Sequence, residues 1–209
     1  MSTTVLFDFD GVIADTEPQY DLYYNRLAQE YKLGIDDFPS KIKGMPLTEI
    51  IDKYFAHCAH NERDNIIART HEYELQMTFR PVSGVIEFIQ YLDRHNYKKA
   101  IVTSSPTAKM DIALQKMQLN AYFPVVITAD HITKGKPDPM CYLLAAAQLH
   151  AAPSQCVVFE DSLSGIAAAR NAAMKVIGVA TTIAADTLQQ HVQPIIEDFS
   201  HLTEVVGLL

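Results

Sequence analysis

The spacing of apolar residues changes character twice along this chain. Near its start, the run Val5-Leu6-Phe7-Asp8-Phe9-Asp10-Gly11-Val12 is apolar except for two acids, which predicts a buried strand that turns at Gly11. From about residue 17 the spacing becomes helical, and we predict helices over 17–33, around 50–55 and over 61–77. Beyond residue 80, short apolar runs predict strands at 99–103, 125–127, 156–159 and 175–179, and helical patterns between them predict helices at 107–117, 138–149 and 164–172.

Alternating strands and helices are typical of a parallel sheet with helices on both faces. We therefore expect an α/β fold, a doubly wound parallel sheet formed by residues 1–14 and 80–209. The helical stretch 15–79 is expected to form an all-helical domain inserted after the first strand.

Composition narrows the class of protein. The 209 residues are 48% hydrophobic and 20% charged, as in an ordinary globular domain. A net charge of −8 argues against nucleic acid or an anionic membrane as a partner. No apolar stretch reaches the roughly 18 residues of a membrane span. The three cysteines are scattered, and the first strand begins close to Met1, so we expect a cytoplasmic protein. We also expect a monomer.

Asp8 and Asp10 are the first candidates for chemistry. Because a strand alternates its faces, the two carboxylates are predicted to point the same way, into the crevice beyond the carboxyl end of the strand. Two such charges about 4 Å apart repel by roughly 4 kcal/mol at an effective dielectric constant of about 20. This repulsion indicates either a bound cation or a catalytic use, and the alternative is a solvated pair of turn acids.

Three further groups of polar residues follow predicted strands. Thr103-Ser104-Ser105 precedes a helix, where free N–H groups favour phosphate, although such residues are often only helix caps. Lys136 lies in a loop before a helix and could neutralise carboxylates or bind phosphate; alternatively it is a surface lysine. Glu160 and Asp161 end another buried run and offer oxygen ligands to a hard divalent cation, whereas helix capping by Asp161 or Ser162 is the competing interpretation.

Taken together, these segments resemble the haloacid dehalogenase superfamily, within it the β-phosphoglucomutase-like phosphatases. The segment from Asp8 to Pro18, Asp-Phe-Asp-Gly-Val-Ile-Ala-Asp-Thr-Glu-Pro, is similar to the first motif of that family almost residue for residue. Thr103-Ser104-Ser105 resembles the second motif and Gly135-Lys136-Pro137 the third. The fourth is matched by Glu160-Asp161-Ser162 with Gly165 and Ile166.

The resemblance implies a Rossmann-like core, a helical cap and a set of roles. Asp8 would be the nucleophile and Asp10 the general acid and base, with Thr103 and Lys136 completing the catalytic set. Mg²⁺ would be held by Asp8, the Asp10 backbone carbonyl and Asp161, with Glu160 binding directly or through water. Gly11, Ser104 and Ser105 would contact phosphate, and Lys43 and Gly44 would form a substrate-specificity loop on the cap, unless Lys43 is only a solvated surface charge.

The chain also departs from the mutase pattern that this resemblance includes. Leu47 replaces an arginine of the cap, Thr107 an asparagine that grips a second phosphate, and Tyr20 a histidine after the first motif. We therefore expect a Mg²⁺-dependent hydrolase of a small phosphorylated metabolite, such as a sugar phosphate, working through an aspartyl-phosphate. A sugar-phosphate mutase, a pyrophosphatase and a non-catalytic regulator that binds a phosphometabolite remain the alternatives.

Overall fold

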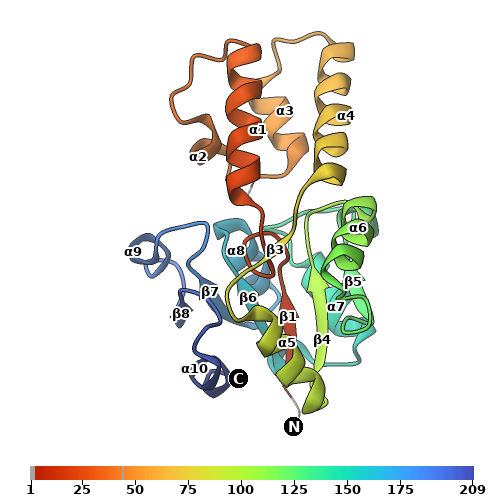
Figure 1. Ribbon diagram of the computed structural model, residues 1–209, viewed down its shortest axis with the longest axis vertical. Helices are drawn as coiled ribbons and strands as arrows, with labels where there is room; N and C mark the ends of the chain where they lie inside the picture. Colours follow the sequence, from red (N-terminus) through yellow and green to blue (C-terminus); the bar gives the residue numbers. More distant parts are fainter. Residues whose placement is uncertain (1–2, 44) are drawn as a thin grey trace.

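A six-stranded parallel sheet forms the centre of the computed structural model, which describes residues 3–43 and 45–209 (Figure 1). Its strand order is β5-β4-β1-β6-β7-β8. The strands are β1 Thr4–Phe7, β4 Lys98–Val102, β5 Val125–Ile127, β6 Cys156–Glu160, β7 Lys175–Val179 and β8 Ile195–Ile196. Phe7 pairs with Ile101 on one side and Phe159 on the other, so the carboxyl ends of β1, β4 and β6 lie level at one edge.

Helices cover both faces of the sheet, which confirms the predicted doubly wound α/β fold. On one face, Val5 and Phe7 of β1 pack in a core with α5 Val85–Arg94, α6 Thr107–Met117 and α10 Leu202–Gly207. Leu6, between them, points to the opposite face and packs with α7 Met140–Gln148 and α8 Leu163–Asn171. This alternation follows from the period of two along a strand. The short α9 spans Ala185–Leu188, and 3₁₀ turns occupy Ala129–His131 and Pro153–Gln155.

The helical insertion lies above the sheet edge in Figure 1. It contains α1 Glu17–Glu30, α2 Phe38–Ile42, α3 Leu47–Tyr54 and α4 His60–Gln76. These helices bury their own apolar cluster, which includes Leu27, Phe38, Phe55 and Ile66. Two very short strands, β2 Ala14–Asp15 and β3 Arg80–Pro81, pair antiparallel where the chain enters and leaves the insertion. The domain boundaries at 14/15 and 79/80 stay a prediction.

Several elements differ from the sequence-based expectation. The predicted helix 138–149 begins only at Met140, because helical backbone is disfavoured at Asp138, which precedes a proline, and the Asp138 side chain instead accepts a hydrogen bond from the Met140 amide at 3.0 Å. The strands β2, β3 and β8 were not predicted, since two residues carry no readable period. The helices α2, α5, α9 and α10 were also missed. Within the described residues, no helix has the length and apolar content needed to cross a membrane.

Candidate active site

Asp8 follows the end of β1 and faces a buried lysine. β1 ends at Phe7, so Asp8 and Asp10 lie in the loop after the strand rather than on it. The loop turns because Gly11 has φ +76° and the amides of Ile13 and Ala14 both donate to the Phe9 carbonyl. Nζ of Lys136 lies 3.0 Å from Oδ1 of Asp8, which places the predicted nucleophile beside the lysine expected to neutralise it.

The electrostatic surroundings of Asp8 leave room for more positive charge. Burial raises the pKa of the Asp8 carboxyl to about 7, opposed by the neighbouring Lys136 and reinforced by Glu160 and Asp10. The pKa of Lys136 is raised, because Asp8 and Glu160 together outweigh the effect of burial. One ammonium group therefore serves two carboxylates, and the site remains short of cationic charge.

Glu160 ends β6 and is fully enclosed. Its Oε1 accepts hydrogen bonds from Lys136 Nζ at 2.5 Å and Tyr142 Oη at 2.9 Å. Its Oε2 accepts from the amides of Asp161 and Ser162 and from the Ser162 hydroxyl. A side chain at Gly165 would overlap this carboxylate, which explains a glycine inside α8. Ser162 also caps α8 by accepting from the Gly165 amide at 3.1 Å, so the competing interpretation of helix capping holds for Ser162.

Asp161 completes a cluster of carboxylates. Within the part of the chain that the structure describes, Asp8, Glu160 and Asp161 are the group that could hold a metal ion, with one oxygen from each lying within 4.8 Å of the others. Burial raises the pKa of Asp161 well above its ordinary value, and Glu160 and Asp8 add to the shift. The Thr182 hydroxyl donates to one Asp161 oxygen. An all-oxygen donor set of this kind fits a hard divalent cation.

Asp10 has a different set of partners. Its Oδ1 accepts from Thr16 Oγ1 at 2.6 Å and its Oδ2 from Ser105 Oγ at 2.8 Å. Nζ of Lys109 lies 2.6 and 2.7 Å from the two oxygens. Burial raises the pKa of Asp10, but Lys109 and these hydrogen bonds outweigh burial, so the pKa is lowered overall. Asp10 is therefore held as a carboxylate by a lysine other than Lys136.

The predicted phosphate-binding residues divide into two groups. Thr103 and Ser104 line the cavity next to Asp8, and the Thr103 hydroxyl accepts a hydrogen bond from the Ser105 amide. The Ser105 hydroxyl donates a hydrogen bond to Asp10 and accepts one from Lys109, so it is already engaged with the side chains around Asp10. The Gly11 amide donates to the Ala14 carbonyl at 2.8 Å, and a contact of Gly11 with phosphate stays a prediction.

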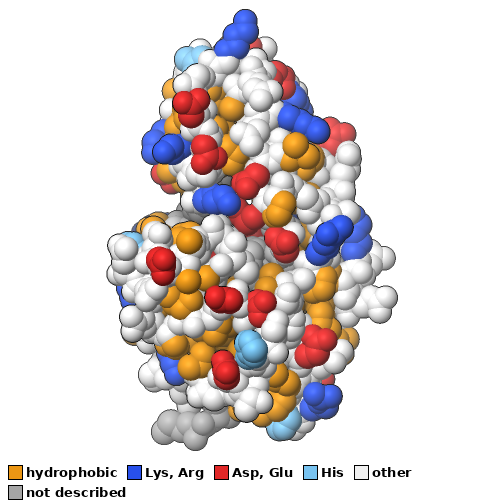
Figure 2. All heavy atoms as spheres, turned by 60° about the vertical axis from the view of Figure 1, so that its left-hand side comes forward, with side chains coloured by type: hydrophobic (Ala, Val, Ile, Leu, Met, Phe, Trp, Pro, Cys, Tyr) orange, Lys and Arg blue, Asp and Glu red, His pale blue; other side chains and the backbone are white. Residues whose placement is uncertain are grey.

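A cavity of about 400 Å³ lies between the sheet edge and the helical insertion. Its sheet side includes Asp8, Asp10, Thr103, Ser104, Lys136 and Asp161, and its insertion side includes Glu17, Tyr20, Asp21, Tyr24, Lys43 and Glu74. Figure 2 shows acidic side chains gathered at the waist between the two parts. Lys43 pairs with Glu17 at 3.3 Å and Asp21 at 3.6 Å, so its charge is already balanced. The predicted Gly44 lies outside the described residues.

Sequence reasoning missed three polar residues at this waist. Lys109 on α6 is fully buried, Tyr20 on α1 was noted only as a replacement, and Glu74 on α4 is 8% exposed. The signal that could have found Lys109 is its position four residues after Ser105, on the helix face that also carries Met110 and Ala113. A lysine on an apolar face indicates a buried partner.

Comparison with known proteins defines the family. The family model described as haloacid dehalogenase-like hydrolase matches residues 5–179. A "Phosphorylated carbohydrates phosphatase" of Thermotoga maritima is 35% identical over 176 residues, 82% of each chain. A "Validoxylamine A 7'-phosphate phosphatase" of Streptomyces hygroscopicus is 31% identical over 194 residues, 91% of each chain. The chain belongs to the haloacid dehalogenase-like hydrolases.

Solved structures agree with this assignment. A putative β-phosphoglucomutase from Thermotoga maritima superposes with a TM-score of 0.73 at 29% identity, covering 99% of both chains. A family IA, variant 3 hydrolase from Entamoeba histolytica gives a TM-score of 0.85 at 25% identity, covering 99% of this chain and 98% of that one. The recognition of the family from the four sequence motifs is thereby confirmed.

Proposed function

We propose that this protein is a Mg²⁺-dependent phosphomonoester hydrolase that acts on a small phosphorylated metabolite through an aspartyl-phosphate on Asp8. The single observation that carries the proposal is the buried pair of Asp8 and Lys136 beside Asp161, at the wall of a cavity. Such a carboxylate can act as a nucleophile when a neighbouring cation offsets the charge of an approaching phosphate.

The covalent step follows from this placement. An oxygen of Asp8 forms a bond to phosphorus while the bond from phosphorus to the leaving alcohol oxygen breaks. The negative charge of the bound phosphate raises the pKa of Asp10, so Asp10 takes up a proton in the complex and delivers it to that oxygen. In the second step Asp10 takes a proton from water as the water attacks phosphorus, which releases inorganic phosphate and restores Asp8. Thr103 and Ser104 line the same wall and would bind the non-bridging oxygens.

Mg²⁺ fits the donor set of Asp8 and Asp161, whose pKa values are both raised by burial. When bound, the ion would supply charge that offsets repulsion between the nucleophile and the phosphate. The Asp10 backbone carbonyl is the third protein ligand that we propose. Glu160 already accepts five hydrogen bonds, which favours a role in holding Lys136 and the turn after β6.

Two features favour a monophosphate of a sugar-like alcohol as the substrate. A relative at 29% identity over 178 residues is a "Fructose-1-phosphate phosphatase" of Escherichia coli, in line with the carbohydrate phosphatase at 35%. On the insertion side of the cavity, Lys43 is balanced by Glu17 and Asp21, so it offers no spare charge for a second phosphate. A mutase has to bind a bisphosphate at both ends, which makes hydrolysis the better fit. We propose that residues 15–79 act as the cap that selects the alcohol.

The test is turnover of p-nitrophenyl phosphate with Mg²⁺. We expect hydrolysis by the wild type, none by Asp8→Asn, and unchanged hydrolysis by Asp186→Asn, which alters an exposed acid on α9. Acid-quenched enzyme should carry phosphate on the wild-type and Asp186→Asn chains but not on Asp8→Asn. Wild-type turnover in Asp8→Asn would contradict the proposal, and the absence of turnover in every protein would favour a binding protein.

A second assay separates hydrolase from mutase. Glucose 1-phosphate supplied with a bisphosphate primer should release inorganic phosphate, whereas formation of glucose 6-phosphate would identify a mutase. A screen over sugar phosphates, nucleotides, phosphoglycolate and pyrophosphate then defines the substrate, with sugar monophosphates expected to give the highest kcat/KM.

A further inference from the structure

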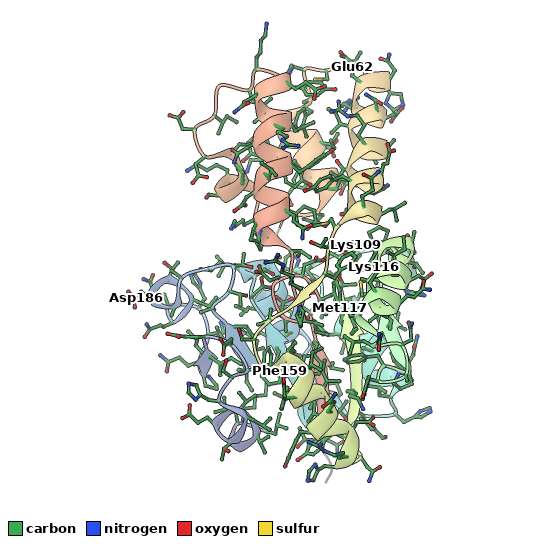
Figure 3. All side chains as sticks on the ribbon, in the orientation of Figure 1. Glu62, Lys109, Lys116, Met117, Phe159 and Asp186 are labelled. Carbon is green, nitrogen blue, oxygen red and sulfur yellow. The ribbon has the colours of Figure 1, made fainter. Side chains whose placement is uncertain are left out.

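Lys109 is a fully buried lysine with four polar contacts. Its Nζ lies 2.6 and 2.7 Å from the Asp10 oxygens, 2.9 Å from Ser105 Oγ and 2.9 Å from Tyr20 Oη. Figure 3 places Lys109 on α6 at the level where the sheet part meets the helical insertion. A buried ammonium group is stable only when it is paired and hydrogen-bonded, so these contacts fix its position.

The contacts continue from Lys109 into the insertion. Tyr20 accepts from Lys109 and donates to Glu74 Oε1 at 2.7 Å. Glu74 is 8% exposed, and its second oxygen has no hydrogen-bond partner among the described residues. The chain of contacts therefore runs from Asp10 after β1, through Lys109 on α6, to Tyr20 on α1 and Glu74 on α4. It joins the sheet part to two helices of the insertion.

The site provides Asp10 with no other cation within bonding distance in the described residues, because Lys136 is paired with Asp8 and Glu160. Thr16 and Ser105 each give Asp10 one further hydrogen bond. Of the four contacts that orient the Asp10 carboxylate, Lys109 supplies two. Without them, rotation of this side chain would be restrained by two hydroxyl groups alone.

We propose that Lys109 is a positioning residue that orients the Asp10 carboxylate for proton transfer and links it, through Tyr20 and Glu74, to the helical insertion. This inference rests on the proposed function, because it assigns the proton-transfer role to Asp10. Lys109 acts through Asp10. Among the described residues, Lys109 makes no hydrogen bond to Thr103 or Ser104, which are proposed to bind phosphate, or to Lys136.

The basicity of the leaving group tests this role. Proton donation matters most when the leaving alcohol is a poor leaving group and little when it is p-nitrophenolate. The value of kcat/KM contains only the steps up to release of the alcohol, so it reports this proton transfer and not the later hydrolysis of the aspartyl-phosphate. We expect Lys109→Met to lower kcat/KM for an alkyl phosphate by about 10- to 100-fold and for p-nitrophenyl phosphate by less than about 3-fold.

A double-mutant cycle separates positioning from general damage. If Lys109 acts through Asp10, then Lys109→Met should change kcat/KM for the alkyl phosphate by less than about 3-fold in an Asp10→Asn background. An equal loss for both substrates, or the same loss with and without Asp10, would overturn the proposal. Lys99→Met is the matched control, since Lys99 is also buried (5% exposed) but pairs with Asp93 at 2.7 Å, at the opposite end of β4.

Tyr20→Phe keeps the proposal testable if Lys109→Met does not fold. It removes only the hydroxyl that joins Lys109 to Glu74 and keeps the ring that stacks on Tyr24. We expect the same selective loss for the alkyl phosphate, smaller in size, and an unchanged ratio of the two substrates would overturn the link to the insertion. If the wild-type protein itself did not hydrolyse p-nitrophenyl phosphate, the result would count against the proposed function. Failure of the proposed function is therefore distinguishable from failure of the role proposed for Lys109.

Discussion

The ammonium group of Lys136 lies between two buried carboxylates, 2.5 Å from Oε1 of Glu160 and 3.0 Å from Oδ1 of Asp8. Glu160 is fully buried and Lys136 is 6% exposed, so water screens neither charge effectively. Removing one partner from such an arrangement leaves an uncompensated buried charge. The lysine therefore contributes to folding as well as to the proposed chemistry.

We predict that Lys136→Met lowers the free energy of unfolding by about 3–5 kcal/mol, the range typical of breaking a buried ion pair. Urea unfolding followed by circular dichroism measures this change. Lys134→Met is the control, because Lys134 is exposed and only 3.9 Å from Asp138, a surface pair that contributes little. Equal stability of the two variants would show that the buried pair is not stabilising.

The glycine at position 165 gives a second prediction. Alanine normally favours a helix over glycine by about 1 kcal/mol. At Gly165, however, a Cβ would overlap the Glu160 carboxylate, so we expect Gly165→Ala to destabilise the protein by about 1–3 kcal/mol and to reduce hydrolysis. Gly207→Ala, near the end of α10 with open space around it, should be neutral or stabilising. Thermal unfolding of both variants distinguishes overlap from helix propensity.

Binding of Mg²⁺ should depend on pH with a definite sign. In the metal-free protein the pKa of Asp8 is raised to about 7, so the folded chain holds this proton more tightly than the unfolded chain. Stability from this group is present below the ordinary pKa of 3.8 and is lost as the pH rises through about 7. Mg²⁺ needs the deprotonated form, so its binding should release protons and tighten as the pH rises.

The measurement is the rise in melting temperature on adding Mg²⁺, compared at about pH 5 and about pH 8. We expect a clearly larger rise at the higher pH, together with proton release seen by calorimetry in two buffers near pH 6. An equal effect at both pH values would contradict a site built on Asp8. Asp8→Asn should weaken Mg²⁺ binding and reduce its pH dependence, and Asp161, whose pKa is also raised, accounts for the remainder.

Glu74 provides a prediction that does not involve a metal ion. Burial raises its pKa, with Asp10 adding to the shift and Lys109 and Tyr20 opposing it. Its contribution to stability is therefore present below the ordinary pKa of 4.5 and is lost as the pH rises through the raised value. Glu74→Gln removes this group, so the stability that Glu74 contributes at low pH in the wild type should be lost. The pH profile of the free energy of unfolding should therefore be flatter in the variant. The exposed Glu72 on the same helix serves as control, since Glu72→Gln should leave the profile unchanged.

The sequence alone placed the main site residues because of how a parallel sheet is built. Asp8, Lys136 and Asp161 each follow a separate apolar strand or its connecting loop, and parallel strands bring their carboxyl ends to one edge. Spacing and chemistry were then sufficient to expect them together. The edge elements β8 and α9 were not foreseen, because elements of two to four residues leave no period to read.

Lys109 and Glu74 were missed for a different reason. Each lies inside a long helix, at a position that the apolar stripe would normally occupy, beside Met110 in α6 and four residues after Thr70 in α4. A charged residue there has meaning only through a partner on another element. Asp10, which lies far away in the sequence, supplies that partner for Lys109. Contacts of this kind depend on the packing of α1, α4 and α6, which the pattern of a single sequence does not specify.

The pairing of Ala14 with Pro81 and of Asp15 with Arg80 brings both ends of the four-helix excursion to one point. With respect to the sheet, the whole helical insertion is one connection whose two ends lie together, and the entropy cost of closing a loop rises only slowly with its length. A helical unit of other size or composition could therefore be grafted between these two short strands with little disturbance to β1. The fold thus allows the helical part, which we propose selects the alcohol, to diverge while the sheet part, which we propose binds the phosphate, is retained.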